Sequence, residues 1–493
     1  MHSACYNAAM ALEPTIGLEI HAELKTATKM FCHSKNDANE TRPNVNICPV
    51  CLAHPGVLPV INKEALKKVL SVGVAVGGRL ADYTEFDRKN YFYPDLPKGY
   101  QLSQYEFPLV SGGLLDGVEL TRIHLEEDTA SSIHDSASSS NTEGDTLIDY
   151  NRSGVPLMEL VTEPVIKSAE KAVSFARELQ LLLRYLGVSD ANLEKGEMRV
   201  EANVSVAEMG KLGTKVEIKN LNSFRSAERA IEFEINRQSR EIQSGGNVVQ
   251  ETRGWDEKSQ KTFSQRIKEV AADYRYFPDP DLPSLKISEF KEFHIDTLRL
   301  ELPELPAARK DRYIAAGVKK DDAQQYVRDI PIASFFDEVI KVLSGDLKYI
   351  QLASNYIAND LVSMRRDTDD QDTQFKVKIP VSAGNFASLI KLVVDGRISS
   401  RAAKDILLEM YKRNVEPESY ASEHGLFKLA ADAIGPIVER ILADNASVVS
   451  DYRNGKEAAL KYLVGQGMKL SKGTADPTVL IELIKTKIAS TPA

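Results

Sequence analysis

The sequence predicts an α+β half followed by an all-helical half, and three observations support this. Before about residue 300, turns, glycines, prolines and alternating polar and apolar residues dominate, whereas Ala, Leu, Ile, Lys and Glu recur at helical spacing after it. The 493 residues, 43% hydrophobic and 27% charged, are ordinary for a globular protein and sufficient for about three domains. No apolar run approaches the ~18 residues of a membrane span.

Charge and cysteine content narrow the function classes. Lys and Arg number 62 against 71 Asp and Glu, and the net charge of −9 disfavours a protein that coats DNA but leaves RNA binding through a local patch open. Four cysteines do not make a disulfide framework, and the N-terminal stretch MHSACYNAAMALEP lacks the basic residues of a signal peptide. We expect a cytoplasmic protein without a membrane segment.

The first half begins with a strand that is apolar on one face only. In residues 15–24, TIGLEIHAEL, the apolar residues alternate with Glu19, His21 and Glu23. The segments 197–206 and 215–219 alternate in the same way on either side of a glycine-containing turn, which indicates an antiparallel hairpin.

Two helices are predicted from apolar residues that recur every three or four positions. One spans about 168–186 and stops at Gly187, and the other spans about 223–242 and ends before Gly245. The stretch LPELPAARKDRY, which starts at Leu302, marks the hinge between the two halves. A second boundary is expected between residues 396 and 403.

Acidic residues on the predicted strands offer a metal site. Glu19 and His21 are two positions apart, so they lie on one strand face about 6.6 Å from each other and could ligate a divalent cation or serve in acid–base chemistry. The alternative is a solvent-exposed polar face. In RIHLEED the apolar phase switches, so alternation cannot choose between Glu126 and Glu127, and Glu159 needs a partner if it is buried among apolar neighbours. Together these residues would form a mostly oxygen-ligated Mg²⁺ site.

Two further segments carry candidate ligand contacts. Residues 86–105, FDRKNYFYPDLPKGYQLSQY, hold six aromatic residues interleaved with three basic ones. This composition suits stacking on unpaired bases and contact with phosphates, and the alternative is a core hairpin with prolines in its turn. Residues 274–284, YRYFPDPDLPS, form either a site loop or a rigid connector.

Three cysteines raise the question of zinc. Cys48 and Cys51 form a CxxC knuckle, and Cys32 lies upstream. A structural zinc site needs four ligands, so His33 or His54 would have to complete this set. The alternative is a group of reduced cysteines without metal.

Some motifs are absent from the sequence. There is no P-loop and no clear GxGxxG that opens a helix, so any use of ATP would follow another mode. There is also no serine amidase motif with a catalytic lysine and no N-terminal nucleophilic cysteine. Any ammonia used by this chain would have to come from another subunit.

These motifs resemble the B subunits of the tRNA-dependent amidotransferases, the GatB family, from about residue 14 to the C-terminus. The matching strings stand in family order. They are TIGLEIHAEL, CPVCLAHPGVLPVIN, FDRKNYFYPDLPKGYQLSQY, RIHLEED, DYNRSGVPLMELVTEP, RVEANVSV, EIKNLNSFR, QETRGWD, DYRYFPDPDLP, DYRNGK and LVGQGMKLSKG.

The resemblance implies a fold and its domains. An N-terminal extension over 1–13 would precede an α+β catalytic cradle over 14–295. A helical domain over 296–405 and a small helical, YqeY-like tail over 406–493 would follow, and the tail would bind tRNA. From residue 451 onward, seven Lys and Arg against four Asp and Glu give a local charge of +3, and Lys461, Lys469 and Lys472 are candidate contacts to the tRNA backbone.

The resemblance also implies an activity. The protein would be a carbon–nitrogen ligase with glutamine as amido donor, working as a heterotrimer with a glutaminase, which is the A subunit in this family, and a small C subunit. With ATP and Mg²⁺ it would convert the side-chain carboxylate of Glu-tRNA(Gln) or Asp-tRNA(Asn) to an acyl phosphate, and ammonia would then displace the phosphate. By motif match, the Mg²⁺ ligands fall on Glu19, His21, Glu127 and Glu159, with Glu126 as a near alternative to Glu127.

The sequence departs from the family pattern at two of these motifs. The family often has a lysine after the acids of RIHLEED, where this chain has Thr129-Ala130-Ser131, so a phosphate contact at that position is in doubt. Zinc-bearing members usually show CxC where this chain has Cys32-His33-Ser34, which lowers the expectation of zinc. A rival interpretation is a non-catalytic, tRNA-binding scaffold subunit, which would not need the acidic residues.

Overall fold

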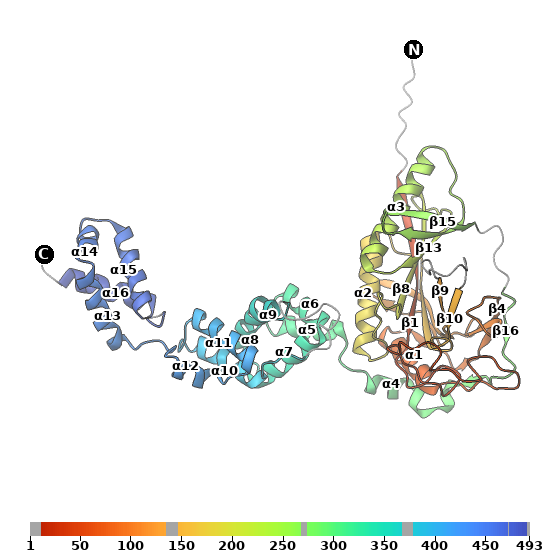
Figure 1. The fold of residues 1–493 in the computed structure, drawn as a ribbon. Coiled ribbons are helices and arrows are strands. Elements are labelled where there is room, and N and C mark those ends of the chain that lie inside the picture. Colours follow the sequence, from red (N-terminus) through yellow and green to blue (C-terminus); the bar gives the residue numbers. More distant parts are fainter. Residues whose placement is uncertain (1–10, 135–145, 268–273, 367–377, 472, 491–493) are drawn as a thin grey trace, which may run out of the picture. The chain divides into compact units, whose positions relative to one another are not determined.

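The computed structural model describes residues 11–134, 146–267, 274–366, 378–471 and 473–490. The chain divides into two compact units, residues 1–305 and 306–493 (Figure 1). The first is built on one large sheet with helices, and the described part of the second is helical. The predicted order, an α+β half followed by a helical half, is therefore confirmed.

A mostly antiparallel sheet organises the first unit. Its main path has the strand order β15-β14-β13-β12-β1-β11-β8-β5-β4-β16, in which only β13 and β14 are parallel. These strands are β1 (Leu12–Glu23), β4 (Asp87–Asn90), β5 (Tyr100–Ser103), β8 (Val118–Glu127), β11 (Pro156–Thr162), β12 (Met198–Glu208), β13 (Val216–Leu221), β14 (Glu251–Asp256), β15 (Lys261–Ile267) and β16 (Phe277–Pro278).

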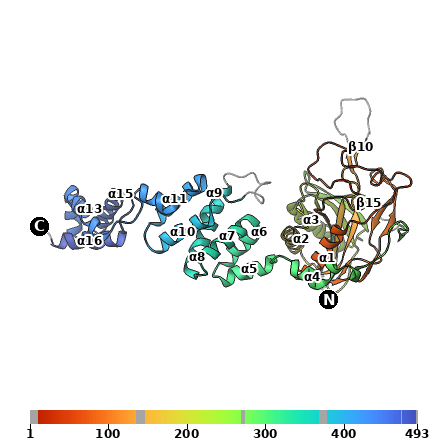
Figure 2. The same cartoon turned by 90° about the horizontal axis from the view of Figure 1, so that it is seen from below.

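Short strands complete the unit. β2 (Arg79–Leu80), β6 (Val110–Ser111) and β7 (Leu114–Leu115) join the large sheet beside its main path. Two pairs stand apart from it: β9 (Ser131–His134) with β10 (Thr146–Asp149), which Figure 2 shows at the edge of the unit, and β3 (Tyr83–Thr84) with β17 (Leu285–Lys286).

Helices cover the apolar face of the sheet. They are α1 (Lys63–Ala75), α2 (Ala169–Tyr185) and α3 (Phe224–Gln243), and α2 and α3 lie side by side in Figure 1. Both predicted helices begin at a serine, because the Ser168 hydroxyl accepts from the Lys171 amide and the Ser223 hydroxyl accepts from the Ser226 amide. The side chains of Ile16, Leu18 and Ile20 on β1 are buried in the core beneath these helices. The opposite face of β1 is therefore left for its polar residues.

The unit boundary lies ten residues beyond the expected end of the cradle. Helix α4 (Ile295–Glu301), which the sequence assigned to the helical domain, packs against α1 of the first unit (Figure 2). Leu298 of α4 is fully buried in the same core as the sheet, which keeps the helix with the first unit. Of the expected N-terminal extension, residues 1–10 lie outside the described residues, and β1 already begins at Leu12.

The second unit is a series of helices. They are α5 (Pro306–Ala315), α6 (Lys320–Arg328), α7 (Ile330–Val342), α8 (Leu347–Tyr356), a π-helical turn (Ile357–Leu361), α9 (Val362–Arg366), α10 (Ala383–Val394), α11 (Ser400–Arg413), α12 (Pro417–Glu423), α13 (Ala431–Asp444), α14 (Ala446–Arg453), α15 (Glu457–Leu470) and α16 (Pro477–Ser490). The expected boundary at 405/406 falls inside α11, whereas a separate apolar cluster over 434–488 gives α13–α16 a core of their own. No helix among the described residues is long and apolar enough to cross a membrane.

Candidate active site

A row of ionisable residues crosses three neighbouring strands on the polar face of the sheet. His21 of β1 lies opposite Glu159 of β11, and Glu159 lies opposite His124 of β8. Residues opposite each other in adjacent strands project from the same face. The sheet register therefore places an imidazole on each side of one carboxylate.

The side chains in and beside this row converge on one point. The His21 Nε2 atom lies 3.4 Å from Glu159 Oε2, 3.5 Å from Glu126 Oε1 and 3.9 Å from Glu19 Oε1. The His124 Nε2 atom lies 3.5 Å from Glu159 Oε2. We call Glu19, His21, His124, Glu126 and Glu159 the acidic cluster.

The structure separates the two neighbouring acids of RIHLEED. Glu126 projects into the acidic cluster, whereas the side chain of Glu127 forms an ion pair with Lys98 and accepts a hydrogen bond of 3.0 Å from the Leu102 amide. Of the predicted site residues, Glu19, His21, Glu126 and Glu159 come together and Glu127 does not join them. The motif-matched choice of Glu127 as a cation ligand thus differs from this geometry.

Burial and crowding of like charges shift the protonation of the cluster. Burial, reinforced by Glu159, raises the pKa of Glu19 to about 7, and burial also raises the pKa of Glu126. His21 is buried, which lowers its pKa, but its hydrogen bond to Glu159 and the nearby carboxylates outweigh this and raise the pKa to about 9. Burial lowers the pKa of His124 to about 4, so this imidazole is neutral at pH 7.

The donor set suits a hard divalent cation. The ligating atoms of Glu19, His21 and Glu159 all lie within 4.8 Å of one another, and the same holds for His124, Glu126 and Glu159. The Oε2 atom of Glu126 and the Nδ1 atom of His124 are buried without a hydrogen-bond partner in the described part of the chain. A buried carboxylate oxygen without a partner is costly, and a cation such as Mg²⁺ would satisfy it. The cluster therefore fits the Mg²⁺ that the family resemblance implies.

A lysine from another strand faces the acidic cluster. Partial burial lowers the pKa of Lys89 on β4. The charge of Glu126, with smaller contributions from Tyr276 and Glu159, more than offsets this effect and holds the pKa above its usual value. Lys89 is therefore a permanent ammonium beside the carboxylates. The Lys89 ammonium thus supplies a positive charge at the acidic cluster, although the lysine that often follows RIHLEED in the family is missing here.

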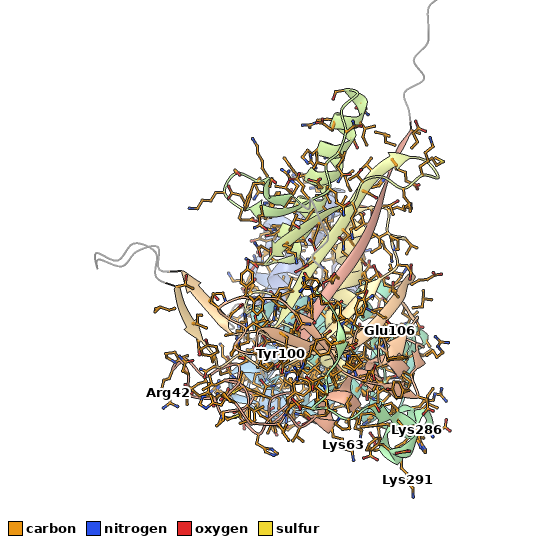
Figure 3. All side chains as sticks on the ribbon, turned by 90° about the vertical axis from the view of Figure 1, so that its right-hand side faces the viewer. Arg42, Lys63, Tyr100, Glu106, Lys286 and Lys291 are labelled. Carbon is orange, nitrogen blue, oxygen red and sulfur yellow. The ribbon has the colours of Figure 1, made fainter. Side chains whose placement is uncertain are left out.

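The aromatic segment and the proline-stiffened loop meet beside the cluster. The segment 86–105 forms a hairpin of β4 and β5, and Phe92 at its turn is 90% exposed. The Arg88 guanidinium donates to Asp279 at 2.6 Å and to Asp281 at 3.1 Å, and it lies 4.3 Å from the ring centroid of Tyr100, which Figure 3 labels. The loop 274–284 is therefore fastened along the hairpin, and both segments border the site.

The cysteines form an incomplete metal site. The sulfur atoms of Cys32, Cys48 and Cys51 lie within 4.8 Å of one another, and no imidazole belongs to this group within the described residues. The Ser34 hydroxyl lies 3.9 Å from Cys51 Sγ. The Cys48 amide donates to Cys51 Sγ at 3.0 Å and holds the knuckle in place. Three thiols leave one corner of the zinc tetrahedron without a protein ligand among the described residues, so the zinc site stays a prediction.

Two residues of the site were not singled out from the sequence. His124 stands two positions before Glu126, which is the same spacing that identified Glu19 and His21, so this signal was available. Lys89 was noted only as one basic residue among aromatic ones. Its approach to Glu126 depends on how β4 and β8 are placed around β5, which has no signature in the sequence.

Cation binding to the cluster should strengthen as the pH rises from 7 to 9. His21 has a pKa of about 9 and is protonated at pH 7, and its proton must leave before the imidazole can coordinate a cation. The Mn²⁺ dissociation constant, measured by calorimetry, should fall about tenfold per pH unit in this range, and replacement of His21 by Gln should flatten the slope. A dissociation constant that is independent of pH in the unaltered protein would contradict the role of His21.

Two family models and many full-length proteins match this chain. The family model described as the GatB/GatE catalytic domain matches residues 14–291, and a second, the GatB domain, matches residues 334–488. Similar full-length proteins are named as B subunits of aspartyl/glutamyl-tRNA(Asn/Gln) amidotransferase. That of Moorella thermoacetica is 43% identical and the match covers 97% of this chain and 100% of the relative. That of Caldicellulosiruptor saccharolyticus is 41% identical, with 97% and 99% covered.

Proposed function

The chain belongs to the GatB family of amidotransferase B subunits, and we propose that it catalyses ATP-dependent amidation of Glu-tRNA(Gln), Asp-tRNA(Asn) or both. The reaction would pass through an acyl phosphate on the side-chain carboxylate, and ammonia would then form Gln-tRNA(Gln) or Asn-tRNA(Asn). The observation that carries this proposal is the acidic cluster, which offers carboxylate and imidazole ligands on the polar face of the sheet. A protein that only bound tRNA would not need it.

The proposed chemistry explains why a metal-binding cluster is required. A carboxylate is a poor acyl donor because oxide is a poor leaving group, and phosphorylation supplies a better one. Mg²⁺ held by Glu19, His21, Glu126 and Glu159 would neutralise the charge of the triphosphate. Lys89 supplies a further positive charge at the same place, where it would bind and orient an anionic group of ATP or of the substrate.

Arginine side chains extend the positive charge around the cluster. Arg122 approaches Glu159 at 3.5 Å and is one-third exposed, so its guanidinium can also reach a ligand. Arg199 is paired with the buried Asp128 and is partly exposed on the neighbouring strand. Together with Lys89 these residues would hold the anionic substrates against the carboxylates, which by themselves would repel them.

The source of ammonia must lie outside this chain. The sequence has no serine amidase motif with a catalytic lysine. We therefore propose that a glutaminase, the A subunit of such an enzyme, delivers ammonia and that a small C subunit completes a heterotrimer with this chain. Acyl phosphates are hydrolysed by water, so internal delivery of ammonia would protect the intermediate.

The proposal predicts how the chain uses nitrogen donors. The purified chain should form ADP and amidated tRNA from misacylated tRNA, ATP and ammonium, and should form no amide from glutamine until the A and C subunits are added. The measurement is release of ADP together with chromatography of the amino acid recovered from the tRNA. Correctly charged Gln-tRNA(Gln) is the matched control, and it should not stimulate ADP release. ADP formation that does not depend on misacylated tRNA would favour the scaffold interpretation.

A further inference from the structure

A row of tyrosine rings passes beside the acidic cluster. Its members touch in the order Tyr93, Tyr91, Tyr274, Tyr276 and Tyr105, with centroid separations of 6.4, 6.0, 5.9 and 4.1 Å. The first three contacts are edge-to-face, whereas Tyr276 and Tyr105 are stacked with an angle of 9° between their planes. We call these five residues the tyrosine row. It combines the aromatic hairpin and the proline-stiffened loop, which are about 180 residues apart in sequence.

The backbone on both sides of the row is held in place by buried or partly buried polar groups. The Asn90 side-chain amide donates to the carbonyl oxygens of Tyr274 at 3.2 Å and Arg275 at 2.8 Å, which aligns the loop with the hairpin. The Asp87 carboxylate accepts from the amides of Tyr105 and Glu106, both at 3.2 Å; Figure 3 labels Glu106. The rings are thus preorganised, although they contribute little to the core.

The middle of the row, Tyr274 and Tyr276, lies beside the acidic cluster, and both of its ends face solvent. The Lys89 ammonium lies 5.2 Å from the ring centroid of Tyr274. Burial raises the pKa of Tyr276 to about 12, with Lys89 opposing and Glu126 reinforcing the shift. Tyr93 is 67% exposed and Tyr105 is 51% exposed. None of the five hydroxyls donates to another residue in the described ranges. Ring faces, edges and hydroxyls are therefore available to a ligand that also reaches the cluster.

We propose that the tyrosine row binds the unpaired nucleotides at the 3′ end of the tRNA. This inference rests on the proposed function, because the misacylated amino acid is attached to the last of these nucleotides and must reach the acidic cluster. Base stacking on aromatic rings is the usual means of holding single-stranded RNA, and Lys89 lies where a backbone phosphate or the esterified end would pass. A row of several rings suits successive bases, whereas the adenine of ATP would need one ring or two.

The test compares two forms of one tRNA. The assembled complex is titrated with uncharged tRNA whose unpaired 3′ nucleotides are intact and with the same tRNA after these nucleotides are removed. The unaltered protein should bind the intact form about tenfold more tightly. The double variant Tyr105→Leu, Tyr276→Leu should bind both forms equally, at the affinity of the trimmed form.

Two matched variants separate stacking from folding. The pair Tyr105→Phe, Tyr276→Phe keeps both ring faces and should retain the preference for the intact 3′ end. Tyr83→Leu should also retain it, because the Tyr83 ring packs on Phe107 and is not a member of the row. Thermal melting of each variant shows whether the fold is kept.

A leucine double variant that still distinguishes intact from trimmed tRNA would overturn the inference. If that variant also had a raised KM for ATP, the rings would be assigned to the adenine of ATP. Because the readout is tRNA binding, a complex that fails to amidate but shows the expected preferences would refute the proposed function and leave the tyrosine row supported.

Discussion

The variant Glu126→Gln should lose amidation activity by about a thousandfold or more while its melting temperature stays at or above that of the unaltered protein. Glu126 is almost fully buried, lies 3.5 Å from His21 Nε2 and has one carboxylate oxygen without a partner in the described residues. An amide has the same shape but is a much weaker cation ligand. The loss of a directly bound ligand removes charge stabilisation where the transition state needs it.

The stability half of this prediction follows from the sign of the pKa shift. Burial raises the pKa of Glu126 in the folded chain above the value of about 4.5 in the unfolded chain. At pH values above the unfolded pKa, a group of this kind opposes folding, because the folded state must either ionise it in a buried place or take up a proton. Glutamine removes this cost at pH 7, so the active site gains stability as it loses function.

Glu127→Gln is the matched control because it alters the adjacent acid in the same way. Its carboxylate pairs with Lys98 and accepts from the Leu102 amide, so the change should lower the melting temperature by leaving a partly buried ammonium without its counter-charge. It should leave the Mn²⁺ affinity within about twofold, since Glu127 lies outside the acidic cluster. If instead Glu127→Gln abolished cation binding and Glu126→Gln did not, the motif-matched assignment would stand and the geometric one would fail.

Alternation alone located Glu19 and His21 because β1 is regular over its whole length. β8 is irregular, since its register with β11 shifts between Val161 and Thr162. The shift explains why Val118 and Leu120 imply one facing and Ile123 and Leu125 the other, although all four are buried in the core. After the shift, Glu127 alternates in step with Ile123 and Leu125 and lies on the core face of the sheet. Glu126 therefore projects from the opposite face, where the acidic cluster lies.

Other features depended on contacts between segments that are distant in sequence. The tyrosine row needs residues 91–105 and 274–276 to meet, and period-two patterns carry no information about which strands become neighbours. The same is true of the boundary at 305, because α4 has an ordinary helical sequence and is held in the first unit by tertiary contacts, with α1 and through the burial of Leu298 in the core. The ends of the two predicted helices agree within one residue, because apolar spacing and the glycines that follow each helix are local signals.

Removing the C-terminal tail should weaken tRNA binding much more than turnover. The structure indicates that the chain can be truncated just after Phe427. A β-bridge between Ile398 and Phe427 joins Phe427 to the helices that precede the tail, and the tail has an apolar core of its own. Deletion of residues 429–493 therefore avoids cutting through α11, as a cut at 406 would. The deletion should raise the KM for misacylated tRNA about tenfold or more and change kcat by less than about threefold.

The expected effect comes from positive charge that the tail does not neutralise internally. Lys461 and Lys469 on α15 are exposed and form no ion pair with other described residues, whereas Lys456 is paired with Asp451. Lys472, the third residue expected to contact tRNA, lies outside the described residues. Lysines that contact phosphates release counterions from RNA, so binding should become less sensitive to salt when they are lost.

The double variant Lys461→Ala, Lys469→Ala separates charge from shape in the intact chain. It should reduce the slope of log affinity against log salt concentration by about two, with little change in the melting temperature, since both side chains are exposed. Lys456→Ala is the control, because its charge is already paired, and it should leave the slope nearly unchanged. A deletion of 429–493 that leaves tRNA affinity unchanged across the salt titration would show that the tail does not bind RNA. In that case binding would have to be supplied by the first unit, by residues 306–428 or by the partner proteins.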